Sequence, residues 1–383
     1  MMNGRKKEFS NILDYIYDYG ISSFEEVPFF DMDAAVFAQL AYIELEKCMP
    51  INEAFFADRL QSVLCQYLST VRIDNNEYCL KGDDAFALTV MSSPRYKDVI
   101  VSKISKIDSV TEKIQFYGIQ FILPNGISVI SYRGTDFSIT GWEENADLAC
   151  YSNISGQKLA ATFLQEAYLE YPTFKFEVVG HSKGGNFAVF AASLLNEKDD
   201  ERLLNVFSFD GPGLLKDMAD FIGHKRIQKK IVHIIPDEEM VGMLLSHETP
   251  SYVVEIAMKG DFIGSHYIMN WKVSGDHFVR ADSISQMSKT IAGTNEKLFD
   301  DYLGDLSVRK EFFSFFFQTI RKLGIDDPRK IFDSPIDFFL SFSNAVRKSP
   351  NKKIFIGFIR SYISYFGSSL LKGKQQLTKT RRQ

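Results

Sequence analysis

The chain has 383 residues, of which 45% are hydrophobic and 24% charged, a composition typical of a folded globular protein. Its net charge of -5 argues against general affinity for nucleic acids. The four cysteines, at 48, 65, 79 and 150, have no metal-binding spacing and are predicted to be buried thiols in a reducing compartment. Since neither a secretory signal nor an apolar run of about 18 residues is present, we expect a cytoplasmic protein, and we predict no cofactor and no metal.

Residues 10–70 carry apolar side chains at spacings of three and four, which predicts helices. One of these helices covers Ala34 to Leu45, with Asp31 or Asp33 as its N-cap. We expect residues 1–90 to form a helical lead-in that packs on a following core.

The next part of the chain alternates strands and helices. Two β-rich runs flank Pro124-Asn125-Gly126 and predict a hairpin. Further strands are predicted at 174–179, 205–209, 229–235 and 251–257, and a helix at 156–171. This alternation predicts an α/β core over residues 91–285, with a mostly parallel sheet flanked by helices on both faces.

The most informative stretch is F-K-F-E-V-V-G-H-S-K-G-G-N, residues 174–186. It reads as a buried strand, then Gly180-His181-Ser182-Lys183-Gly184, then an Ala-rich helix. Strand, G-x-S-x-G and helix together are typical of a nucleophile elbow, whose tight turn leaves no room for side chains at the two glycines. Ser182 is therefore the candidate nucleophile; the alternative is a purely structural glycine-rich turn.

A serine nucleophile needs a histidine base, which in this kind of fold follows the serine in the chain. His266 lies in a Gly-flanked loop after the last predicted strand, where such a base is expected. His247 and His277 remain alternatives. The other histidines are set aside. His181 lies at the turn beside Ser182, His224 precedes the candidate acids, and His233 lies within a strand.

The acid that orients the base is expected at the carboxyl end of a strand. Asp237 and Glu239 follow the strand at 229–235, and Asp210 follows the strand at 205–209. We favour Asp237 or Glu239 and keep Asp210 as the third candidate.

An oxyanion hole combines the backbone N–H of the residue after the nucleophile, here Lys183, with a donor from the loop after an earlier strand. Arg133-Gly134-Thr135-Asp136 is such a loop, and Thr135 adds a hydroxyl. The alternative is a turn in which Asp136 caps the next segment and Arg133 forms an ion pair.

Four motifs in order, S-Y-R-G-T-D, V-V-G-H-S-K-G-G-N, F-D-G-P-G and I-I-P-D-E-E-M-V-G-M-L-L, resemble the class 3 (fungal-type) lipases. More narrowly, they resemble a poorly characterised bacterial branch of lipase-like α/β-hydrolases. The resemblance covers about residues 10–290 and implies an α/β-hydrolase fold. It also implies Ser182 as nucleophile, Thr135 with the Lys183 amide as oxyanion hole and His266 as base. The ungapped match places the acid at Glu239, two residues after Asp237.

In the elbow, Lys183 stands where this lipase family usually has leucine. We interpret its side chain either as part of the entry surface, selecting an anionic head group, or as a solvated residue in the first turn of the helix.

Residues 286–383 form a Phe-rich helical extension with a basic tail, and residues 343–383 hold ten Lys or Arg and no acidic residue. The segment 352–371 aligns five apolar side chains on one helical face: Phe355, Ile359, Tyr362, Phe366 and Leu370. This pattern fits a surface-lying membrane helix, which would give peripheral membrane contact through 352–383. A helix docked on the core is the interpretation that we favour.

These features predict a serine ester hydrolase of lipid metabolism that cleaves an acyl ester or lipid through an acyl-enzyme. A thioesterase or acyltransferase would use the same groups. A hydrolase fold without activity, used for binding at a membrane surface or to a partner, is the alternative of another class.

Overall fold

The computed structural model of the chain describes residues 10–52, 57–70, 83–136, 138–257, 259, 262–327, 330, 331, 334–362 and 364. Their central feature is an eight-stranded sheet whose strands lie side by side in the order of the chain. The strands are β1 (Asp58–Arg59), β2 (Ile100–Ser109), β3 (Ile114–Ile122), β4 (Ile127–Tyr132), β5 (Lys175–His181), β6 (Leu203–Phe209), β7 (Ile231–Pro236) and β8 (Ser251–Val254). The first four pair antiparallel and β4 to β8 pair parallel. The predicted α/β class and the hairpin at residues 124–126 are confirmed.

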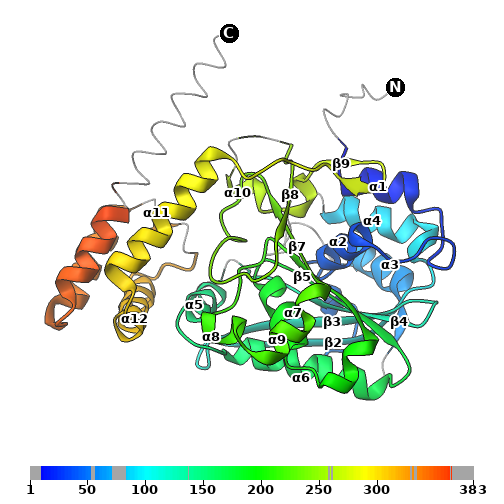
Figure 1. Cartoon of the computed structure of the whole chain (residues 1–383), viewed down its shortest axis with the longest axis horizontal. Helices are drawn as coiled ribbons and strands as arrows, with labels where there is room; N and C mark the ends of the chain where they lie inside the picture. The colour runs from blue at the N-terminus through cyan, green and yellow to red at the C-terminus, as the bar shows by residue number, and fades with distance from the viewer. Residues whose placement is uncertain are drawn as a thin grey trace, which may run out of the picture.

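The order of the parallel strands determines where their connecting helices lie. When each parallel strand is the next neighbour of the one before, right-handed crossovers bring every connecting helix to the same face. These helices are α5 (Ile139–Leu148), α6 (Ser155–Glu170), α7 (Lys183–Ser193), α8 (Lys216–Ala219) and α9 (Ile222–Ile227). Figure 1 shows α6, α7 and α9 grouped together, and α6 and α7 bury Phe163 and Phe187 against the β5 residue Val178.

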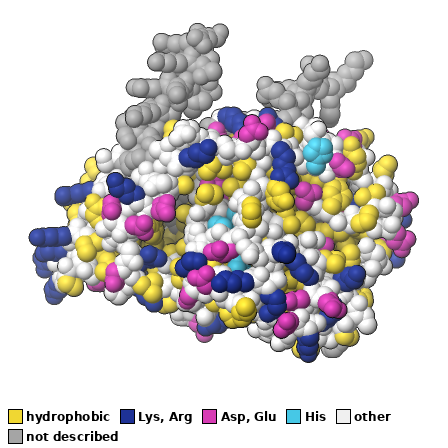
Figure 2. All heavy atoms as spheres, in the orientation of Figure 1, with side chains coloured by type: hydrophobic (Ala, Val, Ile, Leu, Met, Phe, Trp, Pro, Cys, Tyr) yellow, Lys and Arg dark blue, Asp and Glu magenta, His cyan; other side chains and the backbone are white. Residues whose placement is uncertain are grey.

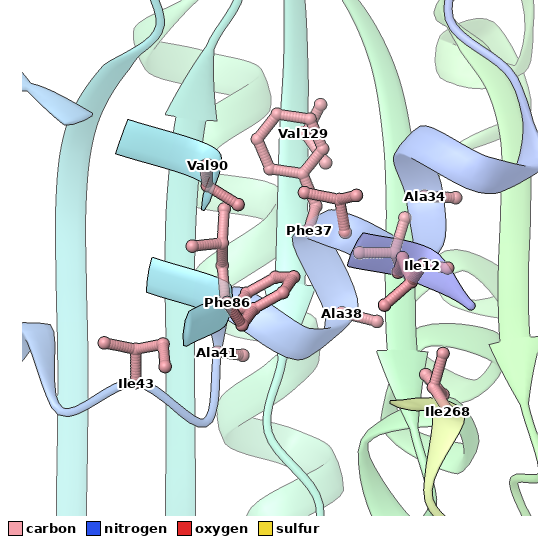
Figure 3. Close-up of a cluster of buried hydrophobic side chains, with 14 of the residues drawn as sticks. Ile12, Ala34, Phe37, Ala38, Ala41, Ile43, Phe86, Val90, Val129 and Ile268 are labelled. Atoms are coloured by element: carbon pink, nitrogen blue, oxygen red, sulfur yellow. The ribbon is translucent and has the colours of Figure 1, made fainter. Parts of the chain in front are cut away.

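The helical lead-in covers the opposite face of the sheet. It consists of α1 (Ile12–Tyr19), α2 (Asp31–Leu40), α3 (Leu60–Thr70) and α4 (Asp83–Ser92). Figure 3 shows Phe37 of α2 beside Val129 of β4, and Phe86 of α4 belongs to the same hydrophobic cluster. Side chains alternate along a strand, so neighbouring residues reach different cores: Val178 lies in the core under α6 and α7, and Val179 lies in the core under the lead-in. The lead-in thus supplies the second helical layer.

The C-terminal extension has its own hydrophobic cluster. Its helices are α11 (Gln286–Leu303), α12 (Leu306–Lys322), α13 (Pro335–Ala345) and a helix over residues 352–362. Phe312 of α12 contacts the rings of both Phe342 and Phe355. Ile139 and Ala146 of α5 pack against the same cluster, which therefore joins the extension to the core.

This packing corrects the interpretation in which the apolar side of the segment 352–371 faces a membrane. Phe355 and Ile359 are buried in the cluster, and Tyr362 is partly buried against it. Phe366 and Leu370 lie outside the described residues. The docked alternative therefore describes the part of this helix that the structure covers, because its aromatic side is occupied by α11, α12 and α13.

The thiols only partly follow the sequence prediction. Cys150 is buried, Cys48 is half-buried and Cys65 is exposed, and all three are free; Cys79 lies outside the described residues. Within the described ranges, no helix combines the length and the apolar character needed to span a bilayer.

Candidate active site

Ser182 occupies the turn between β5 and α7 with φ 58° and ψ -132°. Positive φ is uncommon for a residue with a side chain, and such strain persists only where the surroundings hold it in place. Here the Ser182 N–H donates to the Phe209 carbonyl at 2.9 Å, and the Ser182 carbonyl accepts from the Gly185 N–H at 2.9 Å. The turn has the backbone conformation of the predicted nucleophile elbow.

The two elbow glycines are required by close backbone contacts. A Cβ placed on Gly180 would lie 2.1 Å from the Gly184 carbonyl oxygen. A Cβ on Gly184 would lie 2.0 Å from the Tyr132 carbonyl oxygen. Neither position has room for any side chain, which is the steric reason predicted for G-x-S-x-G.

The loop after β4 lies directly against Ser182. A Cβ on Gly134 would lie 2.9 Å from the Ser182 Cβ. The next residue, Thr135, donates its hydroxyl to Asn145 Oδ1 on α5 at 2.9 Å. Asp136 Oδ1 accepts from the Ser138 N–H at 2.9 Å, just before α5 begins. The loop therefore has the place of the predicted oxyanion loop and also contains the predicted Asp136 turn.

Arg133 makes the ion pair expected of that turn. Its guanidinium lies 3.5 Å from Glu46 Oε1 and over the ring of Tyr117, with 4.1 Å between Cζ and the ring centroid. A loop that lies against Ser182 and a turn with an Arg133 ion pair are therefore compatible in one backbone conformation.

His181 connects the elbow to the lead-in and to the His266 loop. Its Nε2 lies 2.6 Å from the His266 carbonyl, which can only accept, so Nε2 carries the proton. Its Nδ1 then accepts from the Tyr42 hydroxyl at 2.7 Å, and Tyr42 in turn accepts from the Gly134 N–H at 3.1 Å. Burial holds the pKa of His181 well below its usual range, which keeps the ring neutral.

The base candidate His266 is in contact with a carboxylate. Its Nδ1 lies 2.6 Å from Asp210 Oδ2. The ring centroids of His266 and His181 are 4.6 Å apart, so the base candidate lies beside the elbow. Among the described residues, no hydrogen bond joins the Ser182 hydroxyl to His266; such contacts often tighten only when substrate binds.

The loop that carries His266 is held on both sides. His266 follows α10 (Phe262–Ser265), and the Ser265 carbonyl accepts from the Trp271 indole N–H at 2.7 Å. Asn270 donates to the Gly264 carbonyl at 2.8 Å. Trp271 is fully buried, so these hydrogen bonds tie the loop to the core.

Asp210, the third acid candidate, lies beside the base candidate His266, and neither of the two favoured carboxylates does. Asp237 Oδ2 instead accepts from the Lys259 ammonium, and Glu239 Oε1 accepts from the Met243 N–H at 2.9 Å. The physical reason is strand adjacency. Asp210 ends β6, the direct neighbour of the elbow strand β5, whereas Asp237 follows β7, one strand further away.

The buried titratable groups have displaced pKa values. Burial raises the pKa of both Asp210 and Glu239, and the charge of Asp210 raises that of Glu239 further. Burial lowers the pKa of His266 to about 4. Removal from water disfavours the charged form of each group, which explains the opposite directions.

Lys183 corrects both interpretations drawn from the sequence. Its side chain is only 1% exposed and neither lines an entry surface nor reaches solvent. Its ammonium donates to the Gln115 carbonyl at 2.8 Å, to Gln115 Oε1 at 2.7 Å and to the Glu144 carboxylate on α5. The ion pair therefore fastens α5, and with it the partner of Thr135, to the elbow helix.

We expect Lys183→Met to destabilise the fold by about 3–5 kcal/mol, because it leaves the Glu144 carboxylate buried without its cation. Urea unfolding of Lys183→Met and of Lys183→Met/Glu144→Gln would measure this, and the double variant should recover part of the loss. Lys158→Met, at an exposed position on α6, is the matched control and should change stability by less than about 0.5 kcal/mol. Equal effects at Lys183 and Lys158 would contradict the structural role of the pair.

The remaining histidines lie outside this arrangement. His233 stacks on His247 with 4.2 Å between centroids, and both line a small pocket together with His224. His277 is exposed and contacts Asp276. The alternatives His247 and His277 therefore contact neither Asp210 nor Ser182. No three His, Cys, Asp or Glu side chains are grouped to hold a metal ion within the described ranges.

The sheet, the crossovers and the strained serine between β5 and α7 define the chain as an α/β-hydrolase-fold protein of the lipase-like type. Residues 90–318 match the model of the Mbeg1-like family, and the chain belongs to that family. The predicted relation to lipase-like α/β-hydrolases is confirmed at this level.

Solved structures with low sequence identity are also similar. A mutant form of MDLA from Penicillium cyclopium is 17% identical, covering 67% of this chain and 87% of that chain, with a TM-score of 0.39. The mono- and diacylglycerol lipase from Aspergillus oryzae is 15% identical, covering 69% and 95%, with a TM-score of 0.41. The Lip2 lipase from Yarrowia lipolytica is 14% identical, covering 63% and 94%, with a TM-score of 0.36. No curated protein sequence matches the chain.

Proposed function

We propose that the protein is a serine ester hydrolase that acts on an acyl ester or lipid, with Ser182, His266 and Asp210 as its triad. The observation that carries this proposal is the strained Ser182 at the elbow beside a His266 ring whose Nδ1 contacts Asp210. A serine, a base and an orienting carboxylate in this chain order are what acyl transfer needs, although here the acid follows β6.

The proposed reaction begins with attack of the Ser182 hydroxyl on the ester carbonyl. With Asp210 accepting the Nδ1 proton, His266 Nε2 is unprotonated and takes the serine proton, then passes it to the leaving alcohol. Water repeats the sequence on the acyl-enzyme and releases the acid. A pKa of about 4 keeps His266 in the base form at neutral pH.

The negative charge on the carbonyl oxygen needs donors that are already in place. We propose the backbone N–H of Lys183 together with the backbone N–H of Thr135, because the Thr135 hydroxyl already donates its proton to Asn145. Lys183 opens α7, and the first N–H groups of a helix have no partner inside it. The Thr135 loop lies against Ser182, which supports its role as the second donor.

A series of p-nitrophenyl esters from acetate to long acyl chains tests the function directly. The proposal predicts saturable hydrolysis, and the preferred chain length would identify the substrate class. Negligible rates for every chain length, with and without detergent or liposomes, would reject ester hydrolysis and favour a binding role for the fold.

We also propose a cytoplasmic location, which the three free thiols support. For the C-terminal segment we propose contact with an anionic membrane through its basic residues rather than its aromatic side. Lys352, Lys353 and Arg360 are exposed, and Figure 2 shows Lys and Arg side chains at the end of the molecule formed by the C-terminal helices. Such residues contribute about 1 kcal/mol each near an anionic surface.

Neutralising Lys352 and Lys353 together should weaken binding to phosphatidylserine vesicles by about 2 kcal/mol, or roughly 30-fold. Co-sedimentation measures the affinity for these vesicles. A variant neutralised at the exposed residues Lys97 and Lys158 is the control. Equal binding by wild type and both variants would exclude this contact.

A further inference from the structure

Two buried carboxyl groups lie beside the candidate triad, and the proposed reaction uses only one. Asp210 ends β6 and Glu239 follows β7; neither side chain reaches solvent appreciably, with exposures of 0% and 1%. Successive amides of one turn bind them. The Gly242 N–H donates to Asp210 Oδ1 at 3.0 Å, and the Met243 N–H donates to Glu239 Oε1 at 2.9 Å. Adjacent donors place the two carboxyl groups next to each other.

Two neighbouring carboxyl groups that are both buried cannot both ionise at little cost. Burial is the main cause that raises the pKa of each, and the charge of Asp210 raises that of Glu239 further. The other titratable groups nearby do not offset this. His266 and His181 are kept neutral by burial, and Asp237 is paired with Lys259. The pair therefore keeps one proton at neutral pH.

The contacts of the two groups decide which one is ionised. Both Asp210 oxygens have partners, the Gly242 N–H and His266 Nδ1. Glu239 Oε2 is buried and has no hydrogen-bond partner in the described part of the chain. An unpartnered oxygen is much more costly on a carboxylate than on a neutral carboxyl group. The negative charge therefore belongs on Asp210 and the proton on Glu239.

We propose that Glu239 is a positioning residue for the triad: it stays protonated at neutral pH, so that Asp210 alone carries the negative charge that faces His266. This inference rests on the proposed function for its kinetic consequence, but the protonation of the pair does not. Ionisation of Glu239 at higher pH adds a second buried charge, which repels Asp210 from its place against His266.

The sign of the stability effect follows from proton binding. A carboxyl group with a raised pKa in the folded state binds more protons there than when unfolded, so folding stability falls as pH rises from about 4 through about 8. Glu239→Gln keeps a neutral group of the same shape and removes this contribution. The melting temperature of Glu239→Gln relative to wild type should therefore increase from pH 6 to pH 9. Glu112 lies in the exposed turn between β2 and β3 and serves as the control. The melting temperature of Glu112→Gln should change with pH in parallel with that of wild type.

Kinetics give the second readout. Wild-type kcat/KM should fall as pH rises through about 8, and Glu239→Gln should move this limb upward by at least about one pH unit. At pH 7 the variant should lose less than the roughly 10²-fold that a lost acid–base group costs. A loss as large as that of Asp210→Asn would overturn the proposal, because Glu239 would then be the orienting acid. Superimposed melting and rate profiles of variant and wild type would also overturn it.

The two readouts separate this proposal from the proposed function. If no ester is hydrolysed by wild type, the enzyme assignment fails, and the melting profiles still decide whether Glu239 holds the proton. If esters are hydrolysed and the profiles coincide, only the role of Glu239 fails.

Discussion

Replacing Ser182 with alanine is expected to lower kcat for ester hydrolysis by about 10⁶-fold, the size of effect seen when a serine nucleophile is removed from an established triad. The hydroxyl is the atom that forms the acyl-enzyme, so no neighbouring group substitutes for it. Folding should be unaffected, because the hydrogen bonds that hold the elbow use the Ser182 backbone and not its side chain. The rate is measured on the best substrate of the ester series.

Ser193→Ala is the matched control for this variant. Ser193 lies in the same helix, α7, and its hydroxyl donates to the Val189 carbonyl at 2.7 Å, away from the site. Its activity should remain within a few-fold of wild type, because the hydrogen bonds lost, to the Val189 carbonyl and to His224 Nδ1, lie outside the candidate triad. Residual activity of Ser182→Ala above a tenth of wild type would mean that another residue carries out hydrolysis.

Asp210→Asn is expected to lower kcat by about 10⁴-fold, the cost of disturbing the tautomer of a triad histidine. Asparagine keeps the shape and the oxygen that accepts from the Gly242 N–H. When that oxygen faces Gly242, the uncharged NH2 group of asparagine faces His266 Nδ1. An NH2 group donates a hydrogen bond and cannot accept the Nδ1 proton. His266 would then favour the tautomer with the proton on Nε2, which cannot take a proton from Ser182.

The same substitution at Asp237 distinguishes the two carboxylates. Asp237→Asn loses its ion pair with Lys259, whose ammonium is on the surface side, and should retain most activity. A greater loss of activity for Asp237→Asn than for Asp210→Asn would mean that Asp237, after β7, is the triad acid. Comparable melting temperatures of the two variants would show that the difference is catalytic.

The elbow was predictable from sequence because its strand, its G-x-S-x-G turn and its helix lie within one short stretch of the chain. The contacts that exclude a Cβ at Gly180 involve residues four and five positions later, within one motif. Strand, turn and helix also follow one another without interruption, so the position of Ser182 was visible before its long-range contacts with Tyr132 and Phe209 were known.

The contact of Asp210 with His266 was not predictable in the same way, because it depends on which strands are neighbours. The strand ending at Asp210 pairs with the elbow strand along its length, from Phe176↔Leu203 to His181↔Phe209. The sequence contained one signal, a single carboxylate directly at the end of the strand that follows the elbow helix. The acidic run Asp237-Glu238-Glu239 and the lipase resemblance pointed instead to β7.

Long-range partners explain the other differences. The burial of Lys183 depends on Glu144, which lies 39 residues earlier on α5 and offers no local signal. The strand β2 was not predicted, because a bulge between Val101 and Lys103 interrupts its alternation. Its apolar residues Val101, Ile104 and Ile107 consequently recur every third position and imitate helical spacing.

The central claim is that Ser182 is an activated nucleophile, and covalent labelling with a fluorophosphonate tests it most directly. We expect one phosphonyl adduct per chain, located by mass spectrometry on the peptide that contains Ser182. Ser182→Ala should show no adduct, and Asp210→Asn should be labelled far more slowly than wild type. An unlabelled wild-type protein, tested with and without detergent and liposomes, or an adduct on any other serine, would show that Ser182 is not an activated nucleophile.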